Sequence, residues 1–162
     1  VQTCALPIWG TPNLMSANSA ITDADRQSLV SALHSSGRQA VIAVTGGGSL
    51  AISDLLTVPG ASAFLLEARV PYASSALTEW LGREPEQSCS RETALAMAVG
   101  AWQRASRMST SLSNAVGVGC TAALVSNRPK RGEHRAWIAT HTANATHLVG
   151  LSLAKGQRDR LS

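Results

Sequence analysis

Residues 40–56 read AVIAVTGGGSLAISDLL. The apolar, β-branched start of this stretch is typical of a buried strand. The strand breaks at three glycines, residues 46–48, after which apolar residues recur at helical spacing. A strand, a glycine turn and a helix N-terminus leave backbone N–H groups free to face an anion, and the hydroxyls of Thr45 and Ser49 stand at either end of this turn. The pattern predicts either an anion cradle or only a tight strand-to-helix connection. It matches neither the Walker phosphate loop nor the Rossmann glycine spacing.

The composition indicates one globular domain with a real core. The chain has 162 residues, of which 44% are hydrophobic and 15% charged. The net charge of +4 comes partly from four basic residues within 128–135, which we interpret as a solvated loop because few aromatic residues accompany them. Nucleic acid is therefore not an expected partner. Three cysteines without metal or disulfide spacing fit a reducing cytoplasm, and no apolar run reaches the ~18 residues of a membrane span.

The order of helical and strand patterns predicts an α/β layered domain with a mixed sheet. We expect helices after the N-cap residues Thr22 and Ser90, after the glycine turn, and before Gly82. The helix after Ser90 carries an alanine-rich stripe that we interpret as core. Helices alternate with strands in the first half, whereas strands cluster in the second half and end in a hairpin. The expected strands are 39–44, 62–70, 114–124, 136–142 and 146–153.

The two ends of the sequence differ from its middle. Residues 1–18 show no periodicity, and the opening VQTCALPI resembles translated sequencing-adapter sequence. We therefore expect a non-native or disordered leader over residues 1–18. Residues 19–162 are expected to form one domain that is truncated before its last helix. The final strands leave one face of the sheet uncovered, and a further helix would cover it.

Several short segments, in order, resemble the CinA C-terminal domain family. After the glycine turn, VPGAS at 58–62 is similar to the family's Val-Pro-Gly-Ser-Ser, and VPY at 70–72 to its strand end with a tyrosine. MAVGA at 97–101 resembles Met-Ala-Glu-Gly-Ala, and WIA at 137–139 resembles Val-Trp-Ile-Ala. GQR at 156–158 is similar to the family's Gly-Asp-Arg. The resemblance implies a three-layer α/β/α domain with a mixed β-sheet.

Enzymes of this family are nicotinamide-mononucleotide amidohydrolases, and the resemblance implies roles for individual residues. Thr45 falls on the serine that attacks the carboxamide, and Tyr72 on the tyrosine that relays a proton or stabilises the oxyanion. Leu77 falls on the activating lysine, and leucine cannot accept a proton. A well-placed general base contributes ~10²–10⁴-fold, so its loss predicts very low activity. The nearest carboxylates in sequence, Glu67 and Glu79, are expected to be solvated surface groups.

The resemblance also implies a set of ligand-binding residues. The turn would cradle a phosphate, the hydroxyl at 121 would face the ligand, and the arginine of the GQR segment would contribute a charge. The segment at 119–124 has lost the family's glycine and proline pattern. These expected ligand-binding residues are Gly46, Gly47, Gly48, Ser49, Thr121 and Arg158.

Two functional hypotheses follow from the resemblance and from its departures. The first is a catalytically silent relative that binds a pyridine mononucleotide or a similar phosphate ligand. The second is a nicotinamide-nucleotide amidohydrolase that releases ammonia and uses Thr45 in place of the family serine. Neither hypothesis calls for a metal or cofactor. Both imply a small-molecule nucleotide as partner, and both are compatible with a homodimer and with fusion to another domain in the full-length protein.

Overall fold

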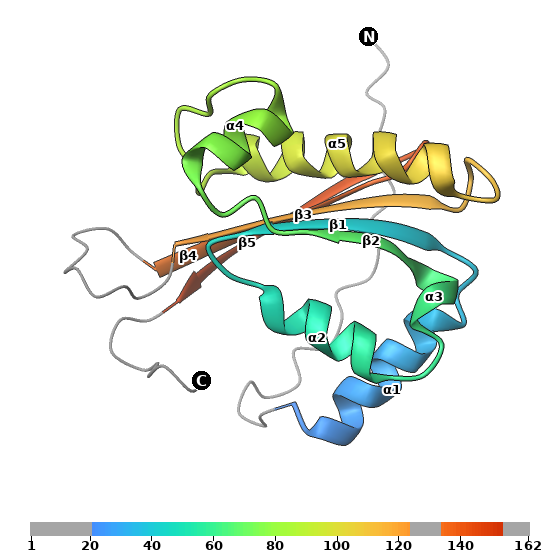
Figure 1. Cartoon of the computed structure of the whole chain (residues 1–162). Coiled ribbons are helices and arrows are strands. Elements are labelled where there is room, and N and C mark those ends of the chain that lie inside the picture. The colour runs from blue at the N-terminus through green and yellow to red at the C-terminus, as the bar shows by residue number, and fades with distance from the viewer. Residues whose placement is uncertain (1–20, 124–133, 154–162) are drawn as a thin grey trace, which may run out of the picture.

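The computed structural model describes residues 21–123 and 134–153 (Figure 1). Within these ranges the helices are α1 (Asp23–His34), α2 (Ser49–Thr57), α3 (Ala61–Phe64), α4 (Ser74–Leu81) and α5 (Arg91–Met108). The strands are β1 (Gln39–Thr45), β2 (Leu65–Arg69), β3 (Ala115–Ala123), β4 (His134–His141) and β5 (Thr146–Leu153). The predicted capping residues begin two of the helices. Thr22 forms a capping box with Asp25, and Ser90 Oγ accepts a hydrogen bond from the backbone N–H of Thr93 at 3.1 Å.

The strands form a mixed sheet in the order β2-β1-β3-β4-β5. β1 lies between β2 and β3 and runs parallel to both, whereas β4 and β5 continue the sheet in antiparallel fashion. The β4–β5 hairpin closes through Thr142, whose backbone N–H donates to the carbonyl of Ala145 at 2.9 Å. The predicted mixed sheet and the C-terminal hairpin are both confirmed.

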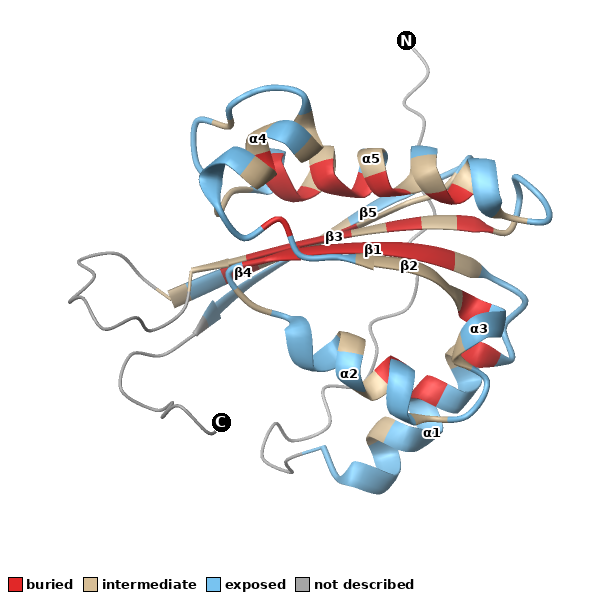
Figure 2. Cartoon of the chain, viewed as in Figure 1, coloured by how far each residue is buried: buried red, intermediate tan, exposed pale blue. Residues whose placement is uncertain are grey.

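Helices cover both faces of the sheet, which confirms the three-layer α/β/α arrangement (Figure 1). α1, α2 and α3 lie on one face, and α4 and α5 lie on the other. Figure 2 shows that the sheet-facing side of α5 is buried, whereas most of α1 and α2 is exposed. The alanine-rich stripe of α5 is core as predicted, and its buried members are Ala94, Met97, Ala98, Ala101 and Ala105.

α5 packs on β3 with no side chain between the two backbones. A Cβ atom built at Gly117 would lie 2.1 Å from the carbonyl oxygen of Ala98. A Cβ atom at Gly119 would lie 2.4 Å from the carbonyl oxygen of Ala94. Two glycines of the strand and the small residues of the helix together allow this approach, because any larger side chain would separate the layers.

The predicted strand over 62–70 is wrong in its first three residues. Ala61–Phe64 forms the single helical turn α3, and the strand begins at Leu65. Gly60 adopts a φ of 99° and begins the turn, which tucks the Phe64 side chain into the core beside His34. A four-residue turn has no measurable period, so its apolar residues could not be distinguished from a strand. Other boundaries shift by a residue or two, with α4 beginning at Ser74.

Candidate functional site

The glycine turn after β1 packs closely on β3. Gly46 and Gly48 have φ angles of 73° and 92°, in the left-handed region that favours glycine. A Cβ atom at Gly46 would lie 1.9 Å from the carbonyl oxygen of Ala122, and one at Gly48 would lie 3.2 Å from Cys120 Sγ. Gly46 therefore has no room for a side chain, whereas at Gly48 the positive φ favours glycine and a Cβ atom would need a small shift of the Cys120 side chain.

A small pocket lies at the carboxyl ends of β1 and β2. Its volume is about 130 Å³, and the glycine-turn pocket, as we call it, is lined by Val44, Thr45, Gly46, Gly47, Ser49, Val70 and Tyr72. β1 leads into α2 on one face of the sheet, and β2 leads towards α4 on the other face. Neighbouring parallel strands whose connections leave to opposite faces open a crevice at their carboxyl ends, which is where α/β proteins bind ligands.

The N-terminus of α2 borders this pocket and carries no side-chain cap. Gly48 is the N-cap residue and forms no side-chain capping bond, and the first turn of the helix contains no acidic residue. The positive end of the helix dipole and the N–H groups of its first turn are therefore not neutralised by the side chains of the helix itself. This arrangement suits an anionic group placed beside Ser49.

Thr45 and Thr121 are neighbours across the β1–β3 pair. They face each other in the parallel register, and both side chains are buried, with 6% and 0% of their surface exposed. Thr45 reaches the pocket, whereas Thr121 does not line it. Thr121 Oγ1 is buried and has no hydrogen-bond partner among the described residues. A ligand in the pocket would therefore meet Thr45 first, with Thr121 behind it in the sheet.

Leu77 occupies the core rather than the pocket. Its side chain is 2% exposed and packs with Ala43 and Met97 between α4, β1 and α5. Tyr72 is 75% exposed at the pocket rim. Among the described residues, the pocket lining contains no carboxylate, histidine or lysine. A hydroxyl at Thr45 has therefore no conventional general base beside it.

The two carboxylates nearest in sequence do not line the glycine-turn pocket. Glu67 lies on β2 and binds Arg104 of α5, with 2.7 Å between Oε2 and Arg104 Nε. It is 20% exposed, so it is a paired group rather than the solvated one predicted. Glu79 is exposed, as predicted, and lines a different pocket between α4 and α5.

Two predicted ligand-binding residues, Gly48 and Thr121, do not line the pocket, and a third lies outside the described residues. Gly48 faces Cys120 instead of the pocket, and Arg158 is outside the residues that the structure describes. The sequence did not predict Cys120 as part of this region. Its Sγ lies 3.9 Å from the carbonyl oxygen of Gly47, and burial raises the pKa of its thiol, so it supports the turn as an uncharged group. Nothing in the spacing of the cysteines indicates this contact.

The described residues offer no assembled metal site. Within 21–123 and 134–153, no three side chains of histidine, cysteine, aspartate or glutamate gather where they could share an ion. None of the helices in those ranges combines the length and the apolar character that crossing a bilayer would require. Of the basic segment at 128–135, residues 128–133 lie outside the described residues, whereas Arg135 is exposed on β4 and not in the predicted loop.

The fold and the pocket define an α/β domain with a small pocket at the carboxyl ends of two parallel strands. The chain belongs to the CinA C-terminal domain family, whose family model matches residues 23–159. No curated protein is significantly similar to the chain in sequence.

Solved structures share this fold at low sequence identity. A competence/damage inducible protein from Agrobacterium tumefaciens is 22% identical with a TM-score of 0.63, over 85% of this chain and 83% of that one. A CinA superfamily protein from Escherichia coli is 20% identical with a TM-score of 0.61, over 86% and 87%. Another from Enterobacter cloacae is 18% identical with a TM-score of 0.63, over 90% and 86%. At these identities the likeness is one of fold.

Proposed function

We propose that this domain binds the phosphate group of a pyridine mononucleotide, or of a similar phosphorylated ligand, in the glycine-turn pocket. We further propose that it hydrolyses that ligand slowly or not at all. One observation carries the proposal: the domain keeps an open pocket with uncapped helix N–H groups, whereas a buried leucine outside that pocket holds the position where the family resemblance expects a lysine.

The dimensions of the pocket support a phosphate as the bound group. A volume of about 130 Å³ accommodates a phosphate or a carboxamide, whereas whole ligands usually occupy pockets of roughly 300–1,000 Å³. The rest of a nucleotide would therefore extend beyond the pocket, past the exposed ring of Tyr72. Hydroxyls of Thr45 and Ser49 and the N-terminus of α2 all favour a negatively charged oxygen.

The surroundings of Thr45 support weak or absent catalysis. A hydroxyl becomes a useful nucleophile when a neighbouring base removes its proton. Leu77 is apolar and packed into the core, and Glu67 is engaged by Arg104 on the α5 side of the sheet. Loss of a general base typically costs ~10²–10⁴-fold in rate. The hydroxyl of Tyr72 is the one titratable group on the described pocket lining.

A second candidate function is amide hydrolysis with Thr45 as nucleophile, because Thr45 and Tyr72 line the same pocket. The two candidates place different ends of the ligand in that pocket. The binding hypothesis places the phosphate there, whereas the hydrolytic one places the carboxamide next to Thr45. Nicotinamide mononucleotide, nicotinamide riboside and ribose 5-phosphate therefore distinguish them, because the last two each lack one of these groups.

The binding experiment compares Ser49→Asp with Ser49→Ala in thermal-shift titrations. Ser49 is exposed at the first position of α2, where a carboxylate favours the helix dipole, so Ser49→Asp should fold at least as well as wild type. The same carboxylate repels a phosphate. We expect ribose 5-phosphate to stabilise the wild type and Ser49→Ala more than it stabilises Ser49→Asp. Equal stabilisation of all three proteins would show that the phosphate does not bind in the glycine-turn pocket.

The catalytic experiment measures ammonia released from nicotinamide mononucleotide. Thr45→Val keeps the volume of the buried side chain and removes its hydroxyl, and Tyr72→Phe does the same at the pocket rim. We expect no release above the uncatalysed rate from any of these proteins. Release that disappears in Thr45→Val would favour the hydrolytic function instead. Release that survives in Thr45→Val would exclude Thr45 as the nucleophile.

A further inference from the structure

A second, larger pocket lies on the opposite side of residues 69–72 from the glycine turn. It has a volume of about 470 Å³ and lies between the end of β2 and the helices α4 and α5. Three arginines line it, Arg69 from β2 and Arg104 and Arg107 from α5. We call it the arginine pocket. It shares only Val70 with the lining of the glycine-turn pocket.

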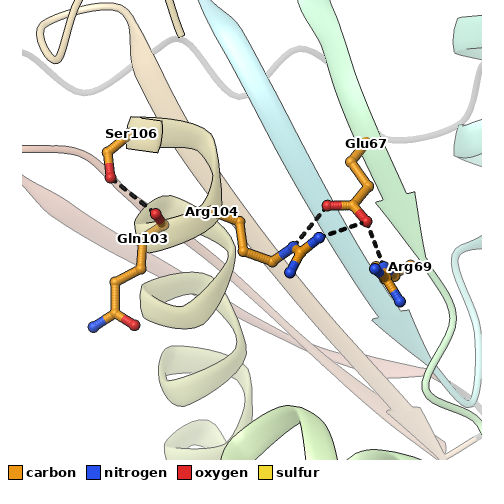
Figure 3. A network of polar contacts seen from close by, with 5 residues as sticks. All are labelled: Glu67, Arg69, Gln103, Arg104 and Ser106. Atoms are coloured by element: carbon orange, nitrogen blue, oxygen red, sulfur yellow. Dashed lines mark hydrogen bonds and ion pairs between the residues drawn. The ribbon is translucent and has the colours of Figure 1, made fainter. Parts of the chain in front are cut away.

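Glu67 fixes two of these arginines in place (Figure 3). Its carboxylate accepts two bonds from Arg104, from Nε at 2.7 Å and from Nη2 at 2.9 Å, and a third from Nε of Arg69 at 2.5 Å. The hydrogen bonds from Arg104 and Arg69 lower the pKa of Glu67, so the carboxylate is ionised at neutral pH. The Arg104 guanidinium also lies over the ring of Trp80, at 5.9 Å from the centroid.

The pinned arginines keep donors for another anion. Arg69 uses only Nε on Glu67, and Arg104 uses Nε and Nη2, so terminal nitrogens of both remain unused among the described residues. The side chain of Arg107 forms no hydrogen bond or ion pair with a described residue and is exposed. A guanidinium held in position loses less conformational entropy when it binds an oxyanion.

The charge balance of the pocket also favours an anion. Three arginines outnumber the two carboxylates at Glu67 and Glu79, which leaves a net charge of +1 in this part of the surface. Arg107 lies in the last turn of α5, where the helix dipole favours a cation without any ligand. The helix dipole accounts for Arg107 alone. It gives no reason for Arg69 of β2 and the amide of Gln103 to line the same pocket, whereas an anionic ligand would.

The remaining lining is apolar and gives the pocket the character of a small-molecule site. Val70, Pro71, Ala76 and Trp80 form a wall beside the guanidinium groups. A pocket of this volume, with apolar walls and a few converging polar groups, suits a ligand that has one charged end and a flat apolar body.

We propose that the arginine pocket binds a small organic phosphomonoester, with its phosphate on Arg69, Arg104 and Arg107 and its apolar part on Pro71 and Trp80. Phosphate is favoured over carboxylate because two or more guanidinium groups converge, and a dianion with three terminal oxygens can bind them together. This site is separate from the glycine-turn pocket and does not depend on the function proposed for it.

The experiment measures binding of phenyl phosphate, inorganic phosphate and benzoate by calorimetry. Arg107→Gln removes an exposed guanidinium that takes no part in the Glu67 network. Arg91→Gln is its matched control, because it removes the same charge from an exposed position of the same helix, about 24 Å away along the axis. Circular dichroism checks that both variants fold.

We expect phenyl phosphate to bind more tightly than inorganic phosphate and about tenfold more weakly to Arg107→Gln, with Arg91→Gln unchanged. Equal binding of inorganic and phenyl phosphate, with the same dependence on Arg107, would assign the site to free phosphate. Tighter binding of benzoate, or no binding at about 10 mM, would overturn the proposal. It would also fail if Arg107→Gln bound normally while Ser49→Asp lost binding, because the phosphate would then lie in the glycine-turn pocket.

Discussion

Replacing Gly46 by alanine tests whether the glycine turn depends on close contact with β3. Gly46 has a φ of 73°, and a Cβ atom there would lie 1.9 Å from the backbone oxygen of Ala122. An L-residue in the left-handed region costs about 1–2 kcal/mol. Forcing a methyl group against a neighbouring backbone costs about 1–3 kcal/mol more. We therefore expect Gly46→Ala to lose about 2–5 kcal/mol of unfolding free energy.

Gly37→Ala is the matched control for this prediction. Gly37 has nearly the same φ, 71°, but a Cβ atom there would have no described atom within 4 Å. Its substitution should therefore cost only the conformational part, about 1–2 kcal/mol. Gly82→Ala, with a φ of 70° and equally open surroundings, provides a second control. The difference between Gly46→Ala and the two controls isolates the contact with Ala122.

Urea unfolding followed by circular dichroism measures these differences. Wild type and variants should share one slope of free energy against urea, because the surface exposed on unfolding is the same. We expect the midpoint of Gly46→Ala to fall well below those of both controls. If all three variants lose the same free energy, the turn moves away from β3 at no cost, and the packing argument for the pocket is refuted.

Two further predictions concern the core and an ion pair. Leu77→Ala should lose about 2–5 kcal/mol in urea unfolding, because it leaves a cavity against Ala43 and Met97. Leu77→Met should lose less than about 1.5 kcal/mol. If Leu77→Ala loses as little as Leu77→Met, the surrounding side chains close the cavity and the prediction is wrong. Glu67→Gln should be less stable than wild type at pH 7. The lowered pKa of Glu67 in the folded state makes the ion pair stabilising above the ordinary value of 4.5, and this contribution disappears as the pH falls through the lowered pKa. The two urea midpoints should therefore converge in acid, and a constant gap would contradict the assignment.

Much of the fold could be predicted from local sequence because the strongest signals agree with one another. The β-branched run of β1 is buried on both sides, and the capping residues Thr22 and Ser90 mark true helix starts. The hairpin of β4 and β5 follows from alternating patterns around a short turn. α3 could not be predicted in this way, because a single helical turn shows no hydrophobic period. It depends instead on the packing of Phe64 beside His34.

The candidate site was predictable only in part. The turn residues are contiguous in sequence, so spacing alone groups Thr45 with the glycines, and resemblance to the family adds Tyr72. The ion pair between Glu67 and Arg104 joins residues 37 positions apart, and no local pattern links them. The support of the turn by Cys120, on another strand, is equally invisible until the register of β1 and β3 is known.

The glycines of β3 bring α5 against the sheet, and this packing should make α5 and β3 harder to open than α2. Gly117 and Gly119 leave backbone in contact with backbone, so α5 and β3 can open only together, and their amide hydrogens should exchange with solvent most slowly. α2 has little more than Leu55 buried and can open alone at a lower free energy. The glycine-turn pocket lies on the border between these two parts. A ligand bound there would therefore slow hydrogen exchange in α2 and leave α5 unchanged.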